Sequence, residues 1–227
     1  MHLMKSCCAI ALIISSLLIY SCREDEMVYL PPVYFNYVPT NTGNIVIYDV
    51  DSTYYLEFDS TVHVFHFQVM ERIDSTYLDN QNRPTQRIER FKRDSVGGTW
   101  YFLSVWNSTL TTSRFERVEE NIRYVKLGFP ISETQTWNGN AYNTLGTEEY
   151  YYLTFHEPLT IATFTFDSTL TVQQADDDNF IHKKYGLEKY ANHIGRVYKE
   201  FIDVDKYPTG VYREGVVYKE TINSYVP

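Results

Sequence analysis

The chain has 227 residues and a formal net charge of -9, with 20 Lys and Arg against 29 Asp and Glu. Hydrophobic residues make up 44% and aromatic residues 16% of it, which is enough apolar mass for a folded core and excludes a wholly disordered chain. The length suits one domain or two small ones. The acidic balance argues against nucleic acid as a partner, because proteins that bind it neutralise phosphates with a basic surface.

Residues 1–22 form an apolar segment behind a single basic residue, Lys5. The uncharged stretch is too short to span a bilayer comfortably, which takes about 20 apolar residues, and it is typical of a secretion signal. It ends with an aliphatic residue three positions before a cysteine and a small residue, Ser21, immediately before it, a pattern that resembles the bacterial lipobox. The resemblance implies a diacylglyceryl group on the Cys22 thiol and signal-peptide cleavage between Ser21 and Cys22. The alternative is an uncleaved apolar anchor that ends in an ordinary cysteine.

The lipobox divides the chain into three predicted parts: a signal peptide over 1–21, a lipidated cysteine and tether over 22–44, and a β domain over 45–227. Removing 21 residues from 227 leaves 206, and the other two cysteines, Cys7 and Cys8, leave with the signal. The mature chain then has no free thiol for a disulfide, a thiolate metal site or a cysteine nucleophile. Two or three acyl chains would hold it stably in the outer membrane.

The tether is predicted to be extended and without helix, because prolines interrupt it at positions 31, 32 and 39. It begins with Arg23 and three acidic residues, which resembles the surface-export signal of Bacteroidota lipoproteins. A solvated charged linker has the same composition. The periplasmic face of the membrane and the cell surface are therefore both open as locations.

From residue 45 onward the composition favours β-strands, since the chain holds 21 Tyr and 13 Phe beside many Val, Ile and Thr. Strands are predicted near 45–50, 53–58, 61–73, 86–93, 99–106, 109–117, 122–127, 149–156, 160–166, 168–174, 195–203 and 215–224. Short breaks between them predict antiparallel neighbours, because parallel strands need long crossovers. The predicted fold is mostly β: one curved antiparallel sheet, as a half-barrel, a barrel or a sandwich, with little helix outside the signal peptide.

Several segments allow more specific predictions. Charges on both faces of 86–93 indicate an edge or solvent-side strand. Apolar residues on both faces of 99–106 indicate a central strand that is covered on both sides. The stretch 180–191 is predicted to hold one short helical turn. A tight hairpin turn is predicted for Trp-Asn-Gly-Asn at 137–140. Another is favoured for Glu-Glu-Asn at 119–121, although the 3, 4 and 3 spacing of Phe115, Val118, Ile122 and Val125 also fits a helix.

No catalytic motif and no metal-binding motif is present in the sequence. His63 and His66 are three residues apart in a predicted strand, which puts them on opposite faces of the sheet, where they cannot chelate one ion. The acidic run Asp176–Asp178 lacks the alternating ligands and central glycine of a calcium loop, so a solvated hairpin tip explains it. Neither a metal nor a cofactor is predicted.

An Asp-Ser-Thr tripeptide occurs at 51–53, 59–61, 74–76 and 167–169, and Asp-Ser-Val at 94–96 is similar to it. Turn chemistry explains the tripeptide, because Asp and Ser side chains bond their own backbone at strand ends. It also resembles the O-glycosylation sequon of Bacteroidota. On that resemblance the acceptors are Ser52, Ser60, Ser75, Ser95 and Ser168.

The chain resembles a group of uncharacterised Bacteroidota lipoproteins in segments that cover most of the mature sequence. They are the lipobox end Ser21-Cys22, PTQRIERFKRD at 84–94, VEENIRYVKLGFP at 118–130, TWNGNAYNTLG at 136–146, FDSTLTV at 166–172 and YANHIGRVYKEF at 190–201. In similar lipoproteins the last segment usually has Leu where this chain has Arg196, so the resemblance implies an apolar contact that this chain lacks. The group has no assigned activity, and a more distant likeness to curved-sheet envelope proteins of the lipoprotein-carrier type suggests a fold only.

These observations predict a lipid-anchored envelope lipoprotein that acts as a non-catalytic binding or assembly module and is not an enzyme. Its predicted partners are the membrane, through the anchor, and an apolar ligand on the concave face of the sheet or another envelope protein. One alternative is a structural subunit of an outer-membrane or surface complex that uses an exposed sheet edge. The other is a glycan-acting enzyme whose carboxylates the sequence does not identify.

Overall fold

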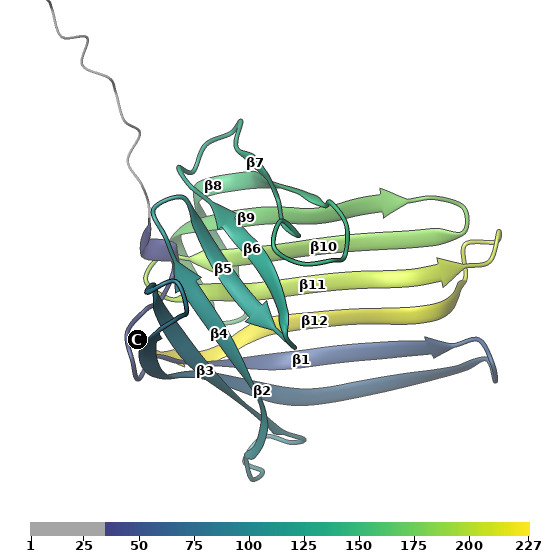
Figure 1. The fold of residues 1–227 in the computed structure, drawn as a ribbon. Coiled ribbons are helices and arrows are strands. Elements are labelled where there is room, and N and C mark those ends of the chain that lie inside the picture. Colours follow the sequence, from purple (N-terminus) through teal and green to yellow (C-terminus); the bar gives the residue numbers. More distant parts are fainter. Residues whose placement is uncertain (1–34) are drawn as a thin grey trace, which may run out of the picture. The chain divides into compact units, whose positions relative to one another are not determined.

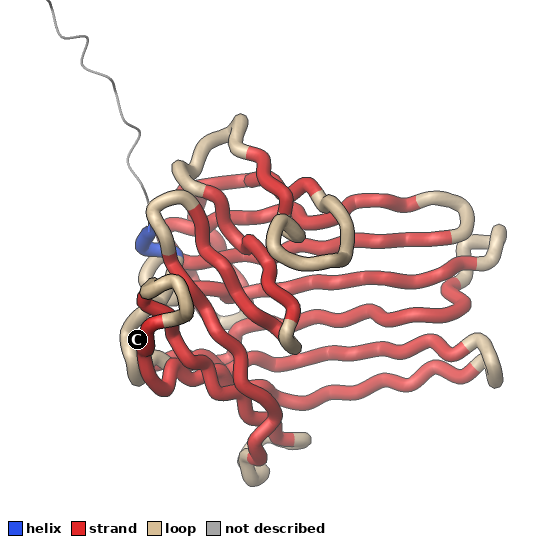
Figure 2. Tube along the Cα trace, viewed as in Figure 1, coloured by secondary structure: helices blue, strands red, loops and turns tan. Residues whose placement is uncertain are grey.

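Twelve β-strands follow one short 3-10 helix in residues 35–227, the part of the chain that this computed structural model describes. The elements are η1 (Phe35–Tyr37), β1 (Ile45–Leu56), β2 (Thr61–Leu78), β3 (Pro84–Arg93), β4 (Tyr101–Leu110), β5 (Arg114–Glu119), β6 (Ile122–Gly128), β7 (Thr136–Asn138), β8 (Glu149–Ile161), β9 (Phe164–Asp178), β10 (His182–Ala191), β11 (Gly195–Lys206) and β12 (Tyr212–Val226). Strands make up most of the trace in Figure 2. No helix within these residues is long and apolar enough to cross a membrane.

All twelve strands form one antiparallel sheet in which neighbours in the chain are neighbours in the sheet. The order is β6-β5-β4-β3-β2-β1-β12-β11-β10-β9-β8-β7, so the first and last strands pair with each other. The outermost strands β6 and β7 also meet: the Val125 N–H donates to the Gly139 carbonyl at 2.8 Å, and Trp137 Nε1 donates to the Val125 carbonyl at 2.9 Å. The sheet thus curls almost into a closed barrel, which confirms the predicted fold class.

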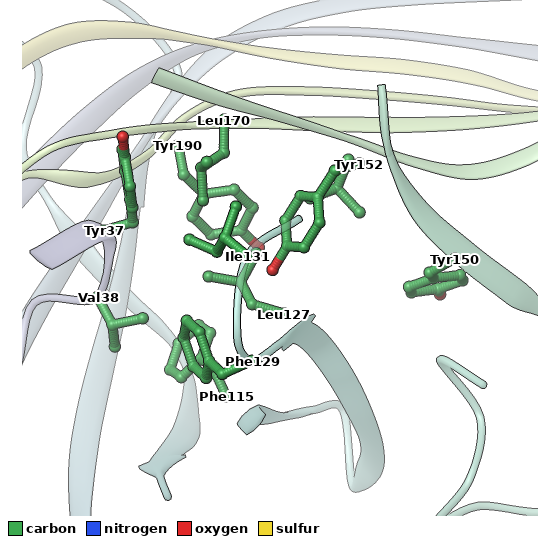
Figure 3. Packing of buried hydrophobic residues seen from close by; sticks show 11 residues of the cluster. Tyr37, Val38, Phe115, Leu127, Phe129, Ile131, Tyr150, Tyr152, Leu170 and Tyr190 are labelled. Carbon is green, nitrogen blue, oxygen red and sulfur yellow. The ribbon is translucent and has the colours of Figure 1, made fainter. Parts of the chain in front are cut away.

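The curled sheet has two layers, and the apolar core lies between them. The shorter strands β4, β5 and β6 cross in front of the long strands β8–β12 (Figure 1). In the main buried cluster, Leu170 and Tyr190 from the long strands face Phe115 and Leu127 from the shorter ones (Figure 3). Tyr37, from η1, belongs to the same cluster.

The last part of the predicted tether packs onto this core. Phe35–Tyr37 forms a turn of 3-10 helix, so the prediction of an extended segment without helix was wrong here. The buried Tyr37 hydroxyl hydrogen-bonds to Ser168 at 2.6 Å and to His156 at 2.7 Å. The prolines indicate an extended chain, but Tyr37 is buried on the domain and the half-buried Phe35 packs against its core.

Tight turns set the strand boundaries, and the sequence identifies only some of them. Glu120 and Asn121 have positive φ angles of 47° and 65°, as a two-residue hairpin turn requires, so the predicted turn between β5 and β6 is confirmed. The turn between β8 and β9 is at Ala162, with φ 51°, where the alternating pattern predicts a continuing strand. A turn without Gly, Asn or Pro gives no local signal.

Three further boundaries differ from the prediction. The break expected between 45–50 and 53–58 is absent, because β1 pairs with β2 without interruption. The expected strand 109–117 is divided by a turn after β4. Most of 180–191 is β10 and contains no helical turn, because a strand on each side holds this segment in the sheet.

The predicted environments of β3 and β4 in the sheet, an edge for β3 and a strand covered on both sides for β4, were both wrong. The charged segment 86–93 lies in β3, which pairs with β2 on one side and β4 on the other, and its Arg90 is buried. Arg90 forms ion pairs with Glu71 and Glu220 inside the molecule. The apolar segment 99–106 is the opposite case: β4 pairs with β5 only from Asn107 onward, so Phe102 and its neighbours are exposed.

The Trp-Asn-Gly-Asn segment ends β7 and does not form the predicted two-residue turn. Neither Asn138 nor Gly139 has a positive φ. Asn138 Oδ1 accepts hydrogen bonds from the N–H groups of Asn140 at 3.0 Å and Glu148 at 3.1 Å, which shapes a longer loop. Glycine is needed at position 139 because a Cβ there would lie 2.2 Å from the ring of Tyr150.

Candidate functional site

The lipobox residues Ser21 and Cys22 lie outside the described residues, so lipidation and signal cleavage stay predictions. Two predicted glycan acceptors, Ser60 and Ser95, are exposed at the turns after β1 and β3. Turn chemistry is confirmed at the first of these, where Asp59 Oδ1 accepts a hydrogen bond from the backbone N–H of residue 61 at 3.1 Å.

The other three predicted acceptors lie within strands, so the turn explanation was wrong for them. Ser52 is buried in β1 and Ser75 is half-buried in β2. Ser168 in β9 is bonded to Tyr37. O-glycosylation itself stays a prediction, and the two exposed turns are where an enzyme has the freest access.

The histidines and acidic residues form no metal centre in residues 35–227. His66 Nδ1 contacts Asp51 Oδ1 at 2.6 Å on one face of β2, and His63 contacts Thr61 at 3.1 Å. Asp178, from the acidic run, is exposed at the end of β9 and pairs with Lys183 at 3.1 Å.

A cluster of charged side chains fills the space between the two layers beside the apolar core. We call it the charge cluster, and its nine members come from seven strands: Glu71, Arg90, Arg117, Glu119, Lys126, Glu188, Arg196, Lys199 and Glu220. All of them except Lys199 are buried. Each carboxylate has at least two basic partners within ion-pair distance, which is the condition under which charges are found inside proteins.

Arg196 is at the centre of the charge cluster. Its Nη2 lies 2.5 Å from Glu220 and 3.2 Å from Glu71, and its Nη1 lies 3.7 Å from Glu188 and 3.8 Å from Glu119. The apolar contact that the resemblance implies at this position is thus replaced by four ionic ones. Because these carboxylates come from four strands, Arg196 joins both layers of the sheet.

Three acidic members of the charge cluster, Glu71, Glu119 and Glu188, have lowered pKa values and stay ionised at neutral pH. Burial alone would raise the pKa of Glu71, but Arg117, Arg196 and Arg90 outweigh burial and hold this pKa at about 2. The same balance, with Lys126 as the strongest neighbour, lowers the pKa of Glu188 to about 2. These groups are therefore fixed ion-pair partners and are not proton donors near pH 7.

The cluster makes the stability of the fold depend on pH in acid. A carboxyl group whose pKa is lowered by folding stabilises the protein above its unfolded pKa, and this contribution is lost as the pH falls through the folded value. For Glu71 the window runs from the usual 4.5 down to about 2.

We expect the free energy of unfolding to fall by a few kcal/mol across that window. Urea unfolding at a series of pH values measures it. Glu71→Gln should flatten the slope, whereas Glu214→Gln, at an exposed position, should leave it unchanged. An equally steep slope in both variants would contradict the assignment to the cluster.

A cavity of about 40 Å³ lies beside the charge cluster, with Tyr48, Glu71, Arg117 and Arg196 in its wall. One water needs roughly 10–15 Å³ of such volume, and ligand pockets usually measure about 300–1,000 Å³. This cavity has room for a few waters and none for an acyl chain.

A second candidate site is at the opposite end of the long strands from η1, where three hairpin turns lie at the same end of the sheet (Figure 1). We call it the tip surface, made of the β1–β2, β9–β10 and β11–β12 turns at 57–60, 179–181 and 207–211. Phe58 is fully exposed there, Phe180 is 86% exposed, and Ile181 and Val211 are mostly exposed. An exposed apolar surface of this kind is a candidate site for contact with another molecule.

Direct contacts hold the three turns together. The Lys206 N–H donates to the Ile181 carbonyl at 2.8 Å, which joins the β9–β10 and β11–β12 turns. The rings of Tyr55 and Tyr212 lie 5.3 Å apart and join the β1–β2 hairpin to the same region. The β11–β12 turn separates two grooves, of about 450 and 470 Å³.

Charged groups around the tip surface pair with one another. Arg213 lies 3.0 Å from Asp205 and 3.6 Å from Glu57, and Asp178 is paired with both Lys183 and Lys206. Exposed apolar residues among paired charges suit a partner with an apolar surface better than a strongly charged one. This surface was not predicted; the only sequence signal is the presence of Phe and Ile in segments that otherwise have turn composition.

Comparisons with known protein families and with curated proteins find no match to this sequence. Among solved structures, the chain is similar to a protein described as a "putative lipoprotein" from Parabacteroides distasonis, with 10% sequence identity and a TM-score of 0.47. The match covers 86% of this chain and 100% of that one. Membership of a Bacteroidota lipoprotein family stays a prediction from the sequence.

Proposed function

We propose that the protein is a lipid-anchored lipoprotein of the outer membrane whose β domain is a non-catalytic binding module. The tip surface is its binding site, and the partner is an apolar segment of another envelope protein. The observation that carries this proposal is that four exposed apolar residues, Phe58, Phe180, Ile181 and Val211, lie at turns on one end of the domain, where Val211 and Phe180 each line a groove. The lipobox at Ser21-Cys22 supports the anchor.

The interior of the domain favours a protein partner over a lipid cargo. The space between the layers is occupied by the apolar core and the charge cluster, and the cavity beside that cluster holds about 40 Å³. A carrier needs a deep apolar cavity, whereas the larger grooves of the described residues lie at the turns.

The glycan-acting alternative has less support. Glycoside hydrolysis needs a carboxyl group with a raised pKa as general acid. In residues 35–227, the carboxyl groups with a clear shift, such as Glu71, Glu119 and Glu188, all have lowered pKa values.

Cross-linking in cells tests the binding site. A photoreactive amino acid at position 181 should capture one defined envelope protein, and Phe180→Ser with Val211→Ser should reduce that capture at least tenfold. Loss of an aromatic anchor at an interface costs about 2 kcal/mol or more, and 1.4 kcal/mol is tenfold. Because both side chains are exposed, the free energy of unfolding should change by less than about 0.5 kcal/mol.

The matched control is Leu153, which is exposed on β8 away from the turns. A photoreactive residue there should not capture the same protein, and Leu153→Ser should leave capture at position 181 unchanged. Equal capture from both positions would contradict a specific tip surface.

A further inference from the structure

The first half of β2 has a neighbouring strand on one side only. Residues 61–67 pair with β1 throughout, whereas pairing with β3 begins at Gln68. In Figure 1 the far end of β2 extends well beyond the crossing point of the front strands. Residues 61–67 therefore present unpaired N–H and C=O groups along an open edge.

This edge lacks the devices that usually block strand pairing. Its seven residues include no Pro, Gly, Lys, Arg, Asp or Glu, and their register with β1 is regular. By contrast, the open part of β8 contains Glu157 and Pro158, and its register against β9 shifts three times. Val62, Val64 and Phe65 on the β2 edge are all exposed, so the edge is apolar as well as open.

A second copy of this chain fits the edge because the edge is complementary to itself. In an antiparallel pair with Val64 opposite Val64, Val62 is opposite His66 and His63 is opposite Phe65. No two like charges meet in this register, although each chain carries a net charge of -9. A self-complementary contact of this kind closes as a twofold dimer.

A groove at the end of the edge has room for the turn of the second copy. It has a volume of about 300 Å³ and lies between His66 and Gln68 of β2 and the residues Asp94–Val96 after β3. In the register above, Thr61 of the second copy is opposite Phe67, the last residue of the open edge. The β1–β2 turn of the copy therefore arrives beside this groove.

We propose that the protein forms a twofold-symmetric dimer by antiparallel pairing of residues 61–67 from two copies, which joins their sheets into one. The contact lies on β2 and brings in the β1–β2 turn, which is part of the tip surface, but it uses neither Phe180 nor Val211. The dimer therefore does not depend on the proposed partner at the tip surface, and the two proposals can fail separately.

Cysteine cross-linking of the full, membrane-anchored chain tests the register. Residues directly opposite each other in an antiparallel pair have Cβ atoms about 4.5–5.5 Å apart. Val64→Cys should therefore give a covalent dimer of this chain on oxidation or with a short bismaleimide. Val62→Cys and His66→Cys should each give at least tenfold less dimer alone, but a strong dimer when combined in one chain.

Two controls make the result specific. Leu153 lies in the open part of β8, and its 53% exposure is close to the 56% of Val64. Leu153→Cys should therefore give no dimer. The unaltered chain reports any cross-link through its own cysteines. Equal dimer from positions 62, 64 and 66 singly, no dimer from Val64→Cys, or a product that contains a different protein would each overturn the proposal.

Co-purification of two differently tagged copies gives an independent measurement. Val64→Lys places two lysines opposite each other on the twofold axis and should reduce co-purification at least tenfold. Leu153→Lys should not reduce it. Unchanged co-purification of the Val64→Lys copies would also overturn the dimer.

Discussion

Replacing Arg196 with leucine is expected to lower the free energy of unfolding by about 3–5 kcal/mol. The Arg196 side chain is 1% exposed and lies within ion-pair distance of Glu71 and Glu220. Its removal leaves these carboxylates short of a counter-charge in a site that water cannot reach freely, and this desolvation is the origin of the cost.

Urea unfolding at pH 7 measures this effect, and Arg213→Leu is the matched control. Arg213 also pairs with carboxylates, but its side chain is 34% exposed, and exposed ion pairs contribute about 0–1 kcal/mol. Arg196→Leu combined with Glu220→Leu should recover part of the loss, because an apolar pair can replace a buried ion pair. If Arg196→Leu and Arg213→Leu lower the free energy of unfolding by the same amount, the charge cluster does not hold the layers together.

Replacing Cys22 with serine is expected to release the protein from the membrane fraction. The lipobox predicts a diacylglyceryl thioether at the thiol of position 22, and a serine hydroxyl cannot form a thioether. Metabolic labelling with palmitate should be lost, and the 227-residue precursor should accumulate uncleaved. Fractionation and intact-mass measurement check both results.

Cys8→Ser is the control for this substitution, because Cys8 lies inside the predicted signal and is removed with it. It should label and fractionate like the unaltered protein. Label that persists in the Cys22→Ser variant, or an unlabelled parent chain, would contradict the lipid anchor and the outer-membrane location that depends on it.

Local sequence patterns predict a good share of the fold. Runs of Val, Ile, Thr and aromatic residues locate most strands, and short breaks require antiparallel pairing. The hairpin at Glu120-Asn121 is predictable because its residues tolerate the positive φ angles of the turn. The turn at Ala162 is not, because a small apolar residue in an alternating segment carries no turn signal.

The candidate sites are harder to predict, because each depends on residues far apart in the chain. Arg90 in β3 looks like a solvated edge residue until Glu71 and Glu220, from two other strands, are seen beside it. The exposed Phe58 and Phe180 lie in turns separated by about half of the chain. Both turns lie at the same end of the sheet because β1 pairs with β12, which brings the N-terminal hairpin next to the C-terminal one.

The sequence alone determined the class of fold, the hairpin connectivity and the predicted lipid anchor, because each depends on a short run of residues whose spacing, propensity or charge acts locally. The tertiary structure alone decided which charges are buried, which strand edge is left open and which turns form one surface. The physical reason is that burial and pairing depend on the strands that cover a segment. In this protein those strands come from opposite ends of the chain, so their effect cannot be seen in any local stretch of sequence.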